Sequence, residues 1–487
     1  MIDRPLPCLA ALFLLASGAA LAQEDAPIET GFLPKEDLGV LRWLEANPEF
    51  DGRGVRVCVV DTGVDLLHPA LQTTSSGRPK VVGYFNATDG TEVDTRTVTH
   101  LEADGSLLGL SGRPLDPAGL APEDGAWRLG LIRSADFLPD ALDERLREQR
   151  KRRAGAAGKE PDGADPIFDV AVFRSGGEWT VVVDTDEDGQ LGDERPVRDF
   201  NAHREVATFP DEVHLGFGVE VEEGGDRTRF FFDAGGHGTH VAGIIGGWYG
   251  EDHPLNGVAP GVEILAAVCG NARLGNVTSH NSIMKCIDWA CRNGADVINV
   301  SFGGSSFFDD GREITAAFVD EAVAKWGVHV VFSAGNTGPA LFTVGAPGTA
   351  WRAYAIGAWA SPRTQESNYG VLAPRRGDLF DFSSRGPLYN GRLGVDFIAP
   401  GAAISSIPTW QLVRSENMNG TSMAAPQATG AIALVLSGAK VAGLPSSEPF
   451  LRKALAQGAR RVDHLLDAEQ GDGLIQVPET FAALARL

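Results

Sequence analysis

The chain has 487 residues, and its 42 lysines and arginines against 65 aspartates and glutamates give a formal net charge of −23. A hydrophobic share of 43% and a charged share of 22% are typical of a globular protein and exclude a disordered, collagen-like or coiled-coil chain. We expect no nucleic-acid partner, because phosphate binding depends on lysine and arginine. At roughly 100–200 residues per domain, the length suits two to four domains, or one large body that carries an insertion.

The first 22 residues resemble an export signal. A short head that contains Arg4 precedes the apolar run CLAALFLLASGAALA, which ends in a small-residue cleavage pattern. An uncleaved membrane anchor is the alternative, although the run is short for a span of ~20 apolar residues. We therefore expect residues 1–22 to be removed and residues 23–50 to form an N-terminal arm. The mature protein is then expected to be exported, to the periplasm or the extracellular space, without a membrane span.

From residue 51 to residue 487, apolar strands alternate with helices. Continuous apolar runs predict strands at 55–61, 262–270, 295–303, 328–336 and 353–360. Helical patterns fall between or after them, near 239–248, 278–293, 312–326 and 422–438. Strands without in/out alternation suit a parallel sheet that is covered on both faces. The sequence therefore predicts an α/β fold with a doubly wound, mostly parallel sheet, in which functional groups gather at the carboxyl ends of strands.

Residues 86–230 interrupt this alternation. The block contains loops rich in glycine, proline and aspartate, a charged helix at 140–153, and strands such as 178–184. Such a high density of turn residues is typical of short strands and helices that are joined by loops. We expect the block to be a small α+β insertion with its own core.

The insertion contains a candidate calcium loop. Asp184, Asp186, Asp188 and Gly189 form a D-x-D-x-D-G sequence, in which three carboxylates can converge on one hard cation and the glycine permits the turn. The glutamate that closes such a loop at its twelfth position is absent, since Arg195 stands there. A structural calcium ion and a solvated acidic turn are both compatible with this pattern.

The cysteines outside the predicted export signal are Cys58, Cys269, Cys286 and Cys291. They are too few for a disulfide framework in a chain of this length, and none forms a C-x-x-C metal pattern. The sequence predicts buried free thiols, with a single structural bridge as the alternative.

Three segments carry the residue types of nucleophilic catalysis. Asp61 ends an apolar strand in VVDTGVD, His237 begins a helix in GGHGTHVAG, and Ser422 begins an apolar helix in NGTSMAAP. Taken singly, each has a structural alternative: a loop-capping aspartate, a partly buried histidine or an N-cap serine. Together they supply a nucleophile, a base that takes its proton, and a carboxylate that orients the base. In SAGN, Asn336 follows a strand, where its amide can donate to a developing oxyanion together with the Ser422 N–H.

The segments DTGVD, HGTHVAG, SAGN and GTSMAAP, in this order, resemble those of the subtilisin family of serine proteases. The resemblance implies Asp61 as orienting carboxylate, His237 as general base and then acid, Ser422 as nucleophile and Asn336 as oxyanion donor. It implies peptide or protein substrates and chemistry that requires no cofactor, and it leaves the oligomeric state open. SFGG, residues 301–304, would pair with an extended substrate backbone, and together with SAGN it would leave room for a sizeable apolar side chain of the substrate. These segments contain Ser301, Gly303, Gly304, Ser333 and Gly335.

The spacing of the motifs resembles one branch of this family. Asp61 and His237 are 176 positions apart, and a long insertion at this place is similar to tripeptidyl-peptidase II. That resemblance would imply an aminopeptidase, in which two glutamates hold the free amino terminus of the substrate. The corresponding positions are Thr278 and Gly304 here, and neither can carry a charge. Burying an ammonium group without a carboxylate costs several kcal/mol.

We therefore expect an endopeptidase, with tripeptidyl release as the first alternative. A catalytically silent subtilisin fold that binds peptides is the second alternative, although all four catalytic positions are filled. A nucleotide-binding α/β protein is excluded, because neither G-x-G-x-x-G nor a P-loop follows a predicted strand.

Overall fold

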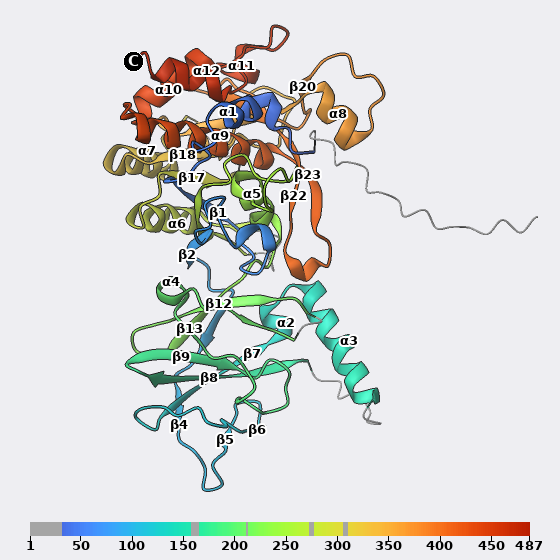
Figure 1. Ribbon diagram of the computed structural model, residues 1–487, viewed down its shortest axis with the longest axis vertical. Coiled ribbons are helices and arrows are strands. Elements are labelled where there is room, and N and C mark those ends of the chain that lie inside the picture. Colours follow the sequence, from blue (N-terminus) through green and yellow to red (C-terminus); the bar gives the residue numbers. More distant parts are fainter. Residues whose placement is uncertain (1–31, 157–164, 211–212, 272–276, 305–309) are drawn as a thin grey trace, which may run out of the picture.

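The computed structural model describes residues 32–156, 165–210, 213–271, 277–304 and 310–487. The described residues form two bodies, which we call the main body and the insertion; Figure 1 shows the insertion below the main body. The predicted export signal at 1–22 lies outside the described residues. Within the described ranges, no helix is both long enough and apolar enough to cross a membrane.

A mostly parallel sheet forms the centre of the main body. Its strands follow the spatial order β2 (Val81–Asn86), β14 (Glu263–Val268), β1 (Arg56–Asp61), β17 (Val297–Val300), β18 (His329–Ser333), β19 (Tyr354–Ala360) and β20 (Asp378–Leu379), and β21 (Phe397–Pro400) also pairs with β19. All of these pairings are parallel except that of β20 with β19. The predicted α/β class with a doubly wound sheet is confirmed.

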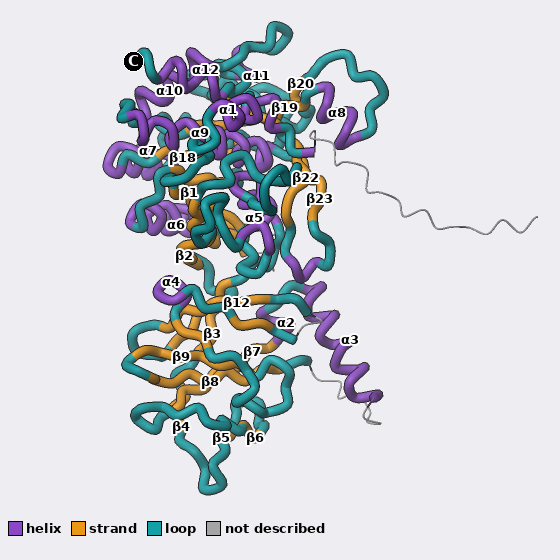
Figure 2. The backbone as a smooth tube through the Cα atoms, in the orientation of Figure 1, coloured by secondary structure: helices purple, strands orange, loops and turns teal. Residues whose placement is uncertain are grey.

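Helices cover both faces of this sheet because its strands are apolar on both sides (Figure 2). In β1, Val57 and Val59 belong to one apolar cluster, whereas Cys58 and Val60 belong to the cluster on the opposite face. A strand with two buried faces has no polar alternation, and this explains the continuous apolar runs in the sequence. The covering helices are α5 (His237–Gly246) and α9 (Thr421–Ala442) on the first face, and α6 (His280–Arg292) and α7 (Ile314–Trp326) on the second.

The predicted N-terminal arm packs against the C-terminal helices. Trp43 of α1 (Val40–Ala46) contacts Phe481 of α12 (Val477–Leu484), with ring centroids 4.9 Å apart. The remaining elements of the main body are α8 (Pro362–Tyr369), α10 (Glu448–Gly458), α11 (Asp467–Gln470), the pair β15 (Gly270–Asn271) and β16 (Val277–Thr278), and the pair β22 (Ala402–Ser406) and β23 (Ser415–Asn419).

The insertion leaves the main body after β2 and returns to it before α5, and it has apolar clusters of its own. One antiparallel sheet contains β4 (Thr97–Thr99), β7 (Trp127–Arg133), β8 (Ile167–Ser175), β9 (Glu178–Val183) and β10 (Val197–Arg198). A second contains β3 (Glu92–Asp94), β11 (Ala207–Thr208), β12 (Gly216–Val221) and β13 (Arg227–Phe231). The hairpin β5 (Leu107–Leu108) and β6 (Pro114–Leu115) and the helices α2 (Ser134–Phe137), α3 (Asp140–Ala156) and α4 (Phe200–His203) complete it.

The cysteines Cys58, Cys269, Cys286 and Cys291 are free and buried, as the sequence predicts. They belong to the apolar cluster between the sheet and the helices α6 and α7. Burial raises the pKa of the Cys291 thiol to about 11, which keeps it protonated and unreactive at neutral pH.

Candidate active site

The carboxyl end of β1 and the start of α5 bring Asp61 against His237. Nδ1 of His237 lies 2.8 Å from Oδ1 of Asp61, and the same oxygen accepts the Thr62 backbone N–H at 2.8 Å. Asp61 is fully buried, whereas a quarter of the His237 side chain is exposed. Because Nδ1 faces a carboxylate it carries the proton, so Nε2 keeps a lone pair that can accept another proton.

The surroundings of His237 adjust its basicity. Burial disfavours the charged imidazole, but the negative charge and the hydrogen bond of Asp61 outweigh it, so the pKa of His237 is raised above 6.5. His240, in the same HGTHVAG segment, has a different hydrogen-bond partner from His237, and its pKa shifts in the opposite direction. It donates Nε2–H to the Glu416 carbonyl at 3.0 Å, and burial lowers its pKa to about 3. His240 is therefore a neutral core residue, and His237 is the histidine that can exchange protons near neutral pH.

Asp233, which belongs to none of the motifs in the sequence, joins the end of β1 to the first turn of α5. Its Oδ1 accepts the Thr62 hydroxyl and the backbone N–H groups of Gly235 and Gly236, each at 2.9 Å. Its Oδ2 accepts the backbone N–H of Thr239 at 2.9 Å. An aspartate just before a helix is a common partner for the unpaired N–H groups of the first turn, and this is the signal that could have identified it.

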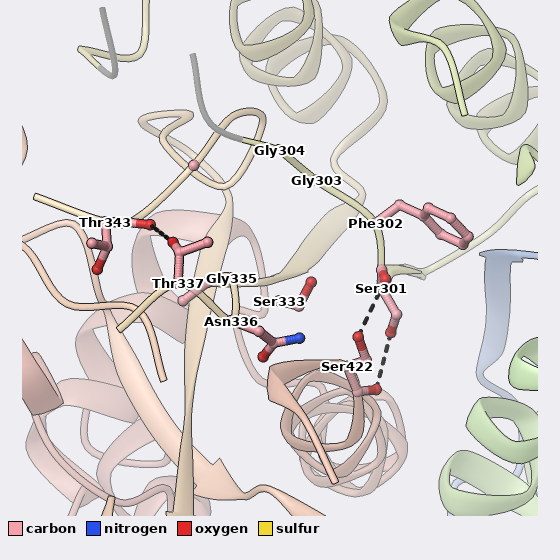
Figure 3. Close-up of a pocket in the computed structure, with 12 residues that line it drawn as sticks. Ser301, Phe302, Gly303, Gly304, Ser333, Gly335, Asn336, Thr337, Thr343 and Ser422 are labelled. Carbon is pink, nitrogen blue, oxygen red and sulfur yellow. Dashed lines mark hydrogen bonds between the residues drawn. The ribbon is translucent and has the colours of Figure 1, made fainter. Parts of the chain in front are cut away.

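Ser422 lies in the first turn of α9 and opens onto a pocket of about 290 Å³ (Figure 3). The opposite walls of this pocket are the segment that follows β17 and the segment that follows β18. The structure brings together here all of the predicted substrate-binding and oxyanion residues: Ser301, Gly303, Gly304, Ser333, Gly335 and Asn336.

The segment 301–302 links Ser422 to the histidine. The Ser422 hydroxyl donates towards the Ser301 carbonyl at 3.4 Å, and the Ser301 hydroxyl donates to the Ser422 carbonyl at 3.1 Å (Figure 3). Phe302, the next residue, faces the His237 ring with centroids 6.1 Å apart. The Ser422 hydroxyl has one proton, so it must leave Ser301 before it donates to the imidazole. Catalytic hydrogen bonds commonly tighten when substrate binds.

The side-chain amide of Asn336 has a fixed orientation. Its oxygen accepts both the backbone N–H of Thr421, at 2.9 Å, and the Thr421 hydroxyl, at 2.8 Å. Its NH₂ group is therefore directed into the pocket, towards the side on which Ser422 lies (Figure 3). An amide donor beside the N–H groups at a helix N-terminus can stabilise an oxyanion.

The candidate calcium loop has a different composition from the predicted one. The carboxylate oxygens of Asp184, Asp186 and Glu194 lie within 4.8 Å of one another. Asp188 lies outside this group, and its Oδ1 accepts the Gln190 backbone N–H at 2.7 Å. Arg113 donates to Oδ2 of Asp184 at 2.7 Å and already neutralises part of the cluster. Three carboxylates suit a hard cation. Calcium binding therefore stays a prediction, and the group that would hold the ion contains Glu194 in place of Asp188.

Known proteins resemble this chain over most of its length. A profile of the subtilase family matches residues 52–473. Tripeptidyl-peptidase 2 of Oryza sativa subsp. japonica is 33% identical over 92% of this chain and 37% of its own length. Pyrolysin of Pyrococcus furiosus is 30% identical over 89% of this chain and 35% of its own length. The chain thus spans little more than a third of the length of these relatives.

The predicted export is wrong. The relatives that match along almost the whole chain include tripeptidyl-peptidase 2 of rice, Arabidopsis thaliana, Caenorhabditis elegans and Drosophila melanogaster, which are cytosolic enzymes. A short apolar run that ends in small residues fits the pattern of an export signal without proving one. Its head also lacks the net positive charge of such signals, since Asp3 offsets Arg4.

Solved structures agree with the sequence relatives. The crystal structure of tripeptidyl peptidase 2 matches with a TM-score of 0.72 at 26% identity, over 92% of this chain and 37% of that chain. Fervidolysin from Fervidobacterium pennivorans, with a TM-score of 0.50 at 20% identity, shares the fold. The family profile, these relatives and the fold lead to one conclusion: the chain belongs to the subtilase family of serine-type peptidases.

Proposed function

We propose that this chain is an endopeptidase that acts through a triad of Asp61, His237 and Ser422, with Asn336 in the oxyanion hole. The observation that carries the proposal is one pocket that combines the Ser422 side chain with the directed amide of Asn336, beside the bonded Asp61–His237 pair. A nucleophile, an oriented base and a preorganised anion site are together the requirements of acyl transfer.

The steps follow from the positions of the protons. Nε2 of His237 takes the Ser422 proton while Oγ attacks the carbonyl carbon of the scissile peptide. The oxyanion accepts hydrogen bonds from Nδ2 of Asn336 and the Ser422 N–H. The C–N bond then breaks, the imidazolium gives its proton to the leaving amine, and an acyl-enzyme remains. His237 next deprotonates a water that attacks the acyl group, and the proton returns to Ser422 as the acid product leaves.

The edge segment 301–304 is the proposed partner of the substrate backbone. It continues from β17, and a side chain at Gly304 would meet open space, so this edge is accessible to an extended peptide. Among the described residues that line the pocket, none carries a charge. We therefore propose that the residue before the scissile bond has an uncharged side chain.

Endopeptidase action is proposed because the expected holders of a free amino terminus are missing. Thr278 uses its hydroxyl to donate to the Cys269 carbonyl at 2.8 Å. Gly304 donates its N–H to the Ala346 carbonyl at 2.9 Å and has no side chain. Neither position offers a carboxylate to an ammonium group, so a blocked or internal peptide should bind as well as one with a free terminus.

A tripeptidyl aminopeptidase is the second candidate. It is favoured by the similarity of nearly the whole chain to enzymes named tripeptidyl-peptidase 2. The two candidates share the proposed triad and differ in their need for a free amino terminus.

A fluorophosphonate probe tests the proposed nucleophile. The probe should label the purified protein, and Ser422→Ala should abolish labelling. Ser437→Ala is the matched control, because Ser437 lies on the same helix and donates to the Arg53 carbonyl at 2.9 Å, away from the pocket. Labelling that survives Ser422→Ala, or that disappears in Ser437→Ala with the fold intact, would refute the assignment.

A further inference from the structure

The loop between β22 and β23, residues 407–414, lies between the main body and the insertion (Figure 1). Its Trp410 is only 6% exposed and belongs to the main apolar cluster of the insertion, together with Phe137 and Phe232. Trp410 is thus a residue of the main body whose side chain completes the core of the insertion.

Trp410 makes two polar contacts that connect the bodies. Its indole N–H donates to the backbone carbonyl of Asp233 at 2.8 Å. Its own carbonyl accepts from the Arg145 guanidinium of α3 at 2.6 Å. Helix α3 of the insertion is therefore joined to Asp233 through a single residue, and both ends of the link are short hydrogen bonds.

Asp233 carries the link to the candidate catalytic pair. Its carboxylate holds the Thr62 hydroxyl at 2.9 Å, and the Thr62 N–H donates to the Asp61 oxygen that His237 also uses. The same carboxylate holds the backbone just before His237, at Gly236. One side chain thus fixes the end of β1 and the start of α5 relative to each other.

The same loop makes further contacts around these segments. Thr409 donates its N–H and its hydroxyl to Oδ2 of Asp65, both at 2.7 Å. The side chain of Gln411 lies so close to Gly236 that a Cβ there would be 2.4 Å from its Nε2. The loop therefore packs directly on the backbone that leads into α5.

We propose that the insertion positions the Asp61–His237 pair through Trp410 and Asp233, which makes these two residues positioning residues for the reaction. This inference rests on the proposed function. Neither residue lines the substrate pocket, so loss of the link should lower kcat and leave KM unchanged, because a displaced general base costs turnover and not binding.

The charged state of His237 gives a second readout. The charged or titratable groups that face it are Asp61 on β1 and Asp233 before α5, and His240 on its own helix is neutral. Asp61 raises the pKa of His237 through its charge and hydrogen bond, against the opposing effect of burial. A looser Asp61–His237 contact should therefore move the acidic limb of the pH profile of kcat/KM to lower pH. If Trp410 had a purely structural role, its substitution would leave that limb in place.

The test compares three variants of the full chain with an N-blocked peptide substrate. Trp410→Phe removes the indole N–H and keeps an aromatic ring. Arg145→Gln releases α3 from the loop and also removes the longer contact of Arg145 with the Val213 carbonyl, at 3.4 Å. Trp127→Phe is the matched control, because Trp127 is fully buried in the insertion and its indole N–H has no hydrogen-bond partner among the described residues. Folding of each variant is checked by circular dichroism and thermal melting.

The proposal predicts that Trp410→Phe lowers kcat about tenfold at unchanged KM, within the ~10²-fold that a displaced catalytic group can cost. The acidic limb of the kcat/KM profile of Trp410→Phe should shift to lower pH. Arg145→Gln should show a smaller decrease in kcat and a smaller shift in the same direction. Trp127→Phe should lower only the melting temperature. The inference is wrong if Trp410→Phe and Arg145→Gln both behave like Trp127→Phe. A wild-type protein without Ser422-dependent cleavage would instead refute the proposed function itself.

Discussion

Thr421 holds the side chain of Asn336 by two hydrogen bonds to a single oxygen, from its backbone N–H at 2.9 Å and from its hydroxyl at 2.8 Å. A flipped amide would place its NH₂ group against these two donors, so the orientation is fixed before substrate arrives. A donor that is already directed at the site of charge development requires no reorganisation during the reaction.

The first prediction concerns this pair. Asn336→Leu should lower kcat by ~10²–10³, the loss that follows removal of the corresponding donor in a subtilisin, with little change in KM. Thr421→Val removes the hydroxyl, which donates to Asn336 and also accepts the Gly335 N–H at 3.2 Å. It should lower kcat about fivefold, since the loss of the neutral hydrogen bond to Asn336 corresponds to ~1 kcal/mol. Steady-state kinetics on a blocked peptide measure both effects. Equal losses in the two variants would contradict the proposed orienting role of Thr421.

The second prediction concerns pH. His237 acts as a base only when its imidazole is neutral, and its pKa lies above 6.5 because Asp61 outweighs burial. Activity should therefore fall as pH falls through this raised pKa, and the acidic limb of kcat/KM should have its midpoint above 6.5. Asp61→Asn removes the charge, so the limb should move to lower pH while kcat falls on the order of 10⁴. A limb that stays in place in Asp61→Asn would show that another group controls it.

The strands and the candidate catalytic residues could be predicted because each is marked by a short stretch of consecutive residues. Continuous apolar runs such as 55–61 identified the strands, because a strand buried on both faces needs apolar residues at every position. The catalytic candidates were recognised because Asp61, His237, Asn336 and Ser422 lie in short motifs at the ends of those elements.

Contacts between distant segments were not predictable. Trp410 bonds Asp233 across 177 positions, and no local pattern in either segment indicates that pairing. The carboxylates that gather in the acidic loop were predictable only in part, since Asp184 and Asp186 lie together and Asp188 does not join them. The D-x-D-x-D spacing favoured Asp188 as the third carboxylate, whereas the structure places Glu194, ten positions after Asp184, in the group instead. The apolar run at 1–22 shows that a compositional pattern alone does not fix where a protein is located.

The third prediction concerns Lys80, which is fully buried and donates its ammonium group to the Pro260 carbonyl at 2.6 Å. Burial lowers the pKa of Lys80 to about 7, against the smaller opposing effect of Asp51. Between pH 7 and 10.5 the folded state then binds fewer protons than the unfolded state, so the free energy of unfolding should rise with pH by up to a few kcal/mol from this group.

Lys80→Met should remove this rise. Urea unfolding at pH 6, 8 and 10 measures the free energy of unfolding of the wild type and the variant, and their difference should change steadily in favour of the wild type as pH increases. The exposed Lys453→Met serves as the control and should follow the wild type. Parallel pH profiles for the wild type and Lys80→Met would contradict the prediction.

The fourth prediction concerns the acidic loop. Burial, together with the charges of Asp186 and Asp184, raises the pKa of Glu194 to about 7, and hydrogen bonds from Thr185 only partly offset this. A bound cation would relieve the crowding of negative charge. Calcium should therefore raise the melting temperature by a few degrees, EDTA should reverse the gain, and Asp186→Asn should abolish it. A melting temperature that is independent of calcium would leave the loop as a solvated acidic turn.

Endopeptidase action by Ser422 is tested with one peptide in two forms, with a free and with an acetylated amino terminus, each incubated with the wild type and with Ser422→Ala. The peptide carries an uncharged residue before its internal scissile bond. Because Thr278 and Gly304 offer no carboxylate, we expect kcat/KM values for the two forms within about twofold of each other, internal fragments from both forms, and no cleavage by Ser422→Ala. Release of tripeptides from the free peptide alone, with the acetylated form resistant, would refute endopeptidase action and establish the aminopeptidase.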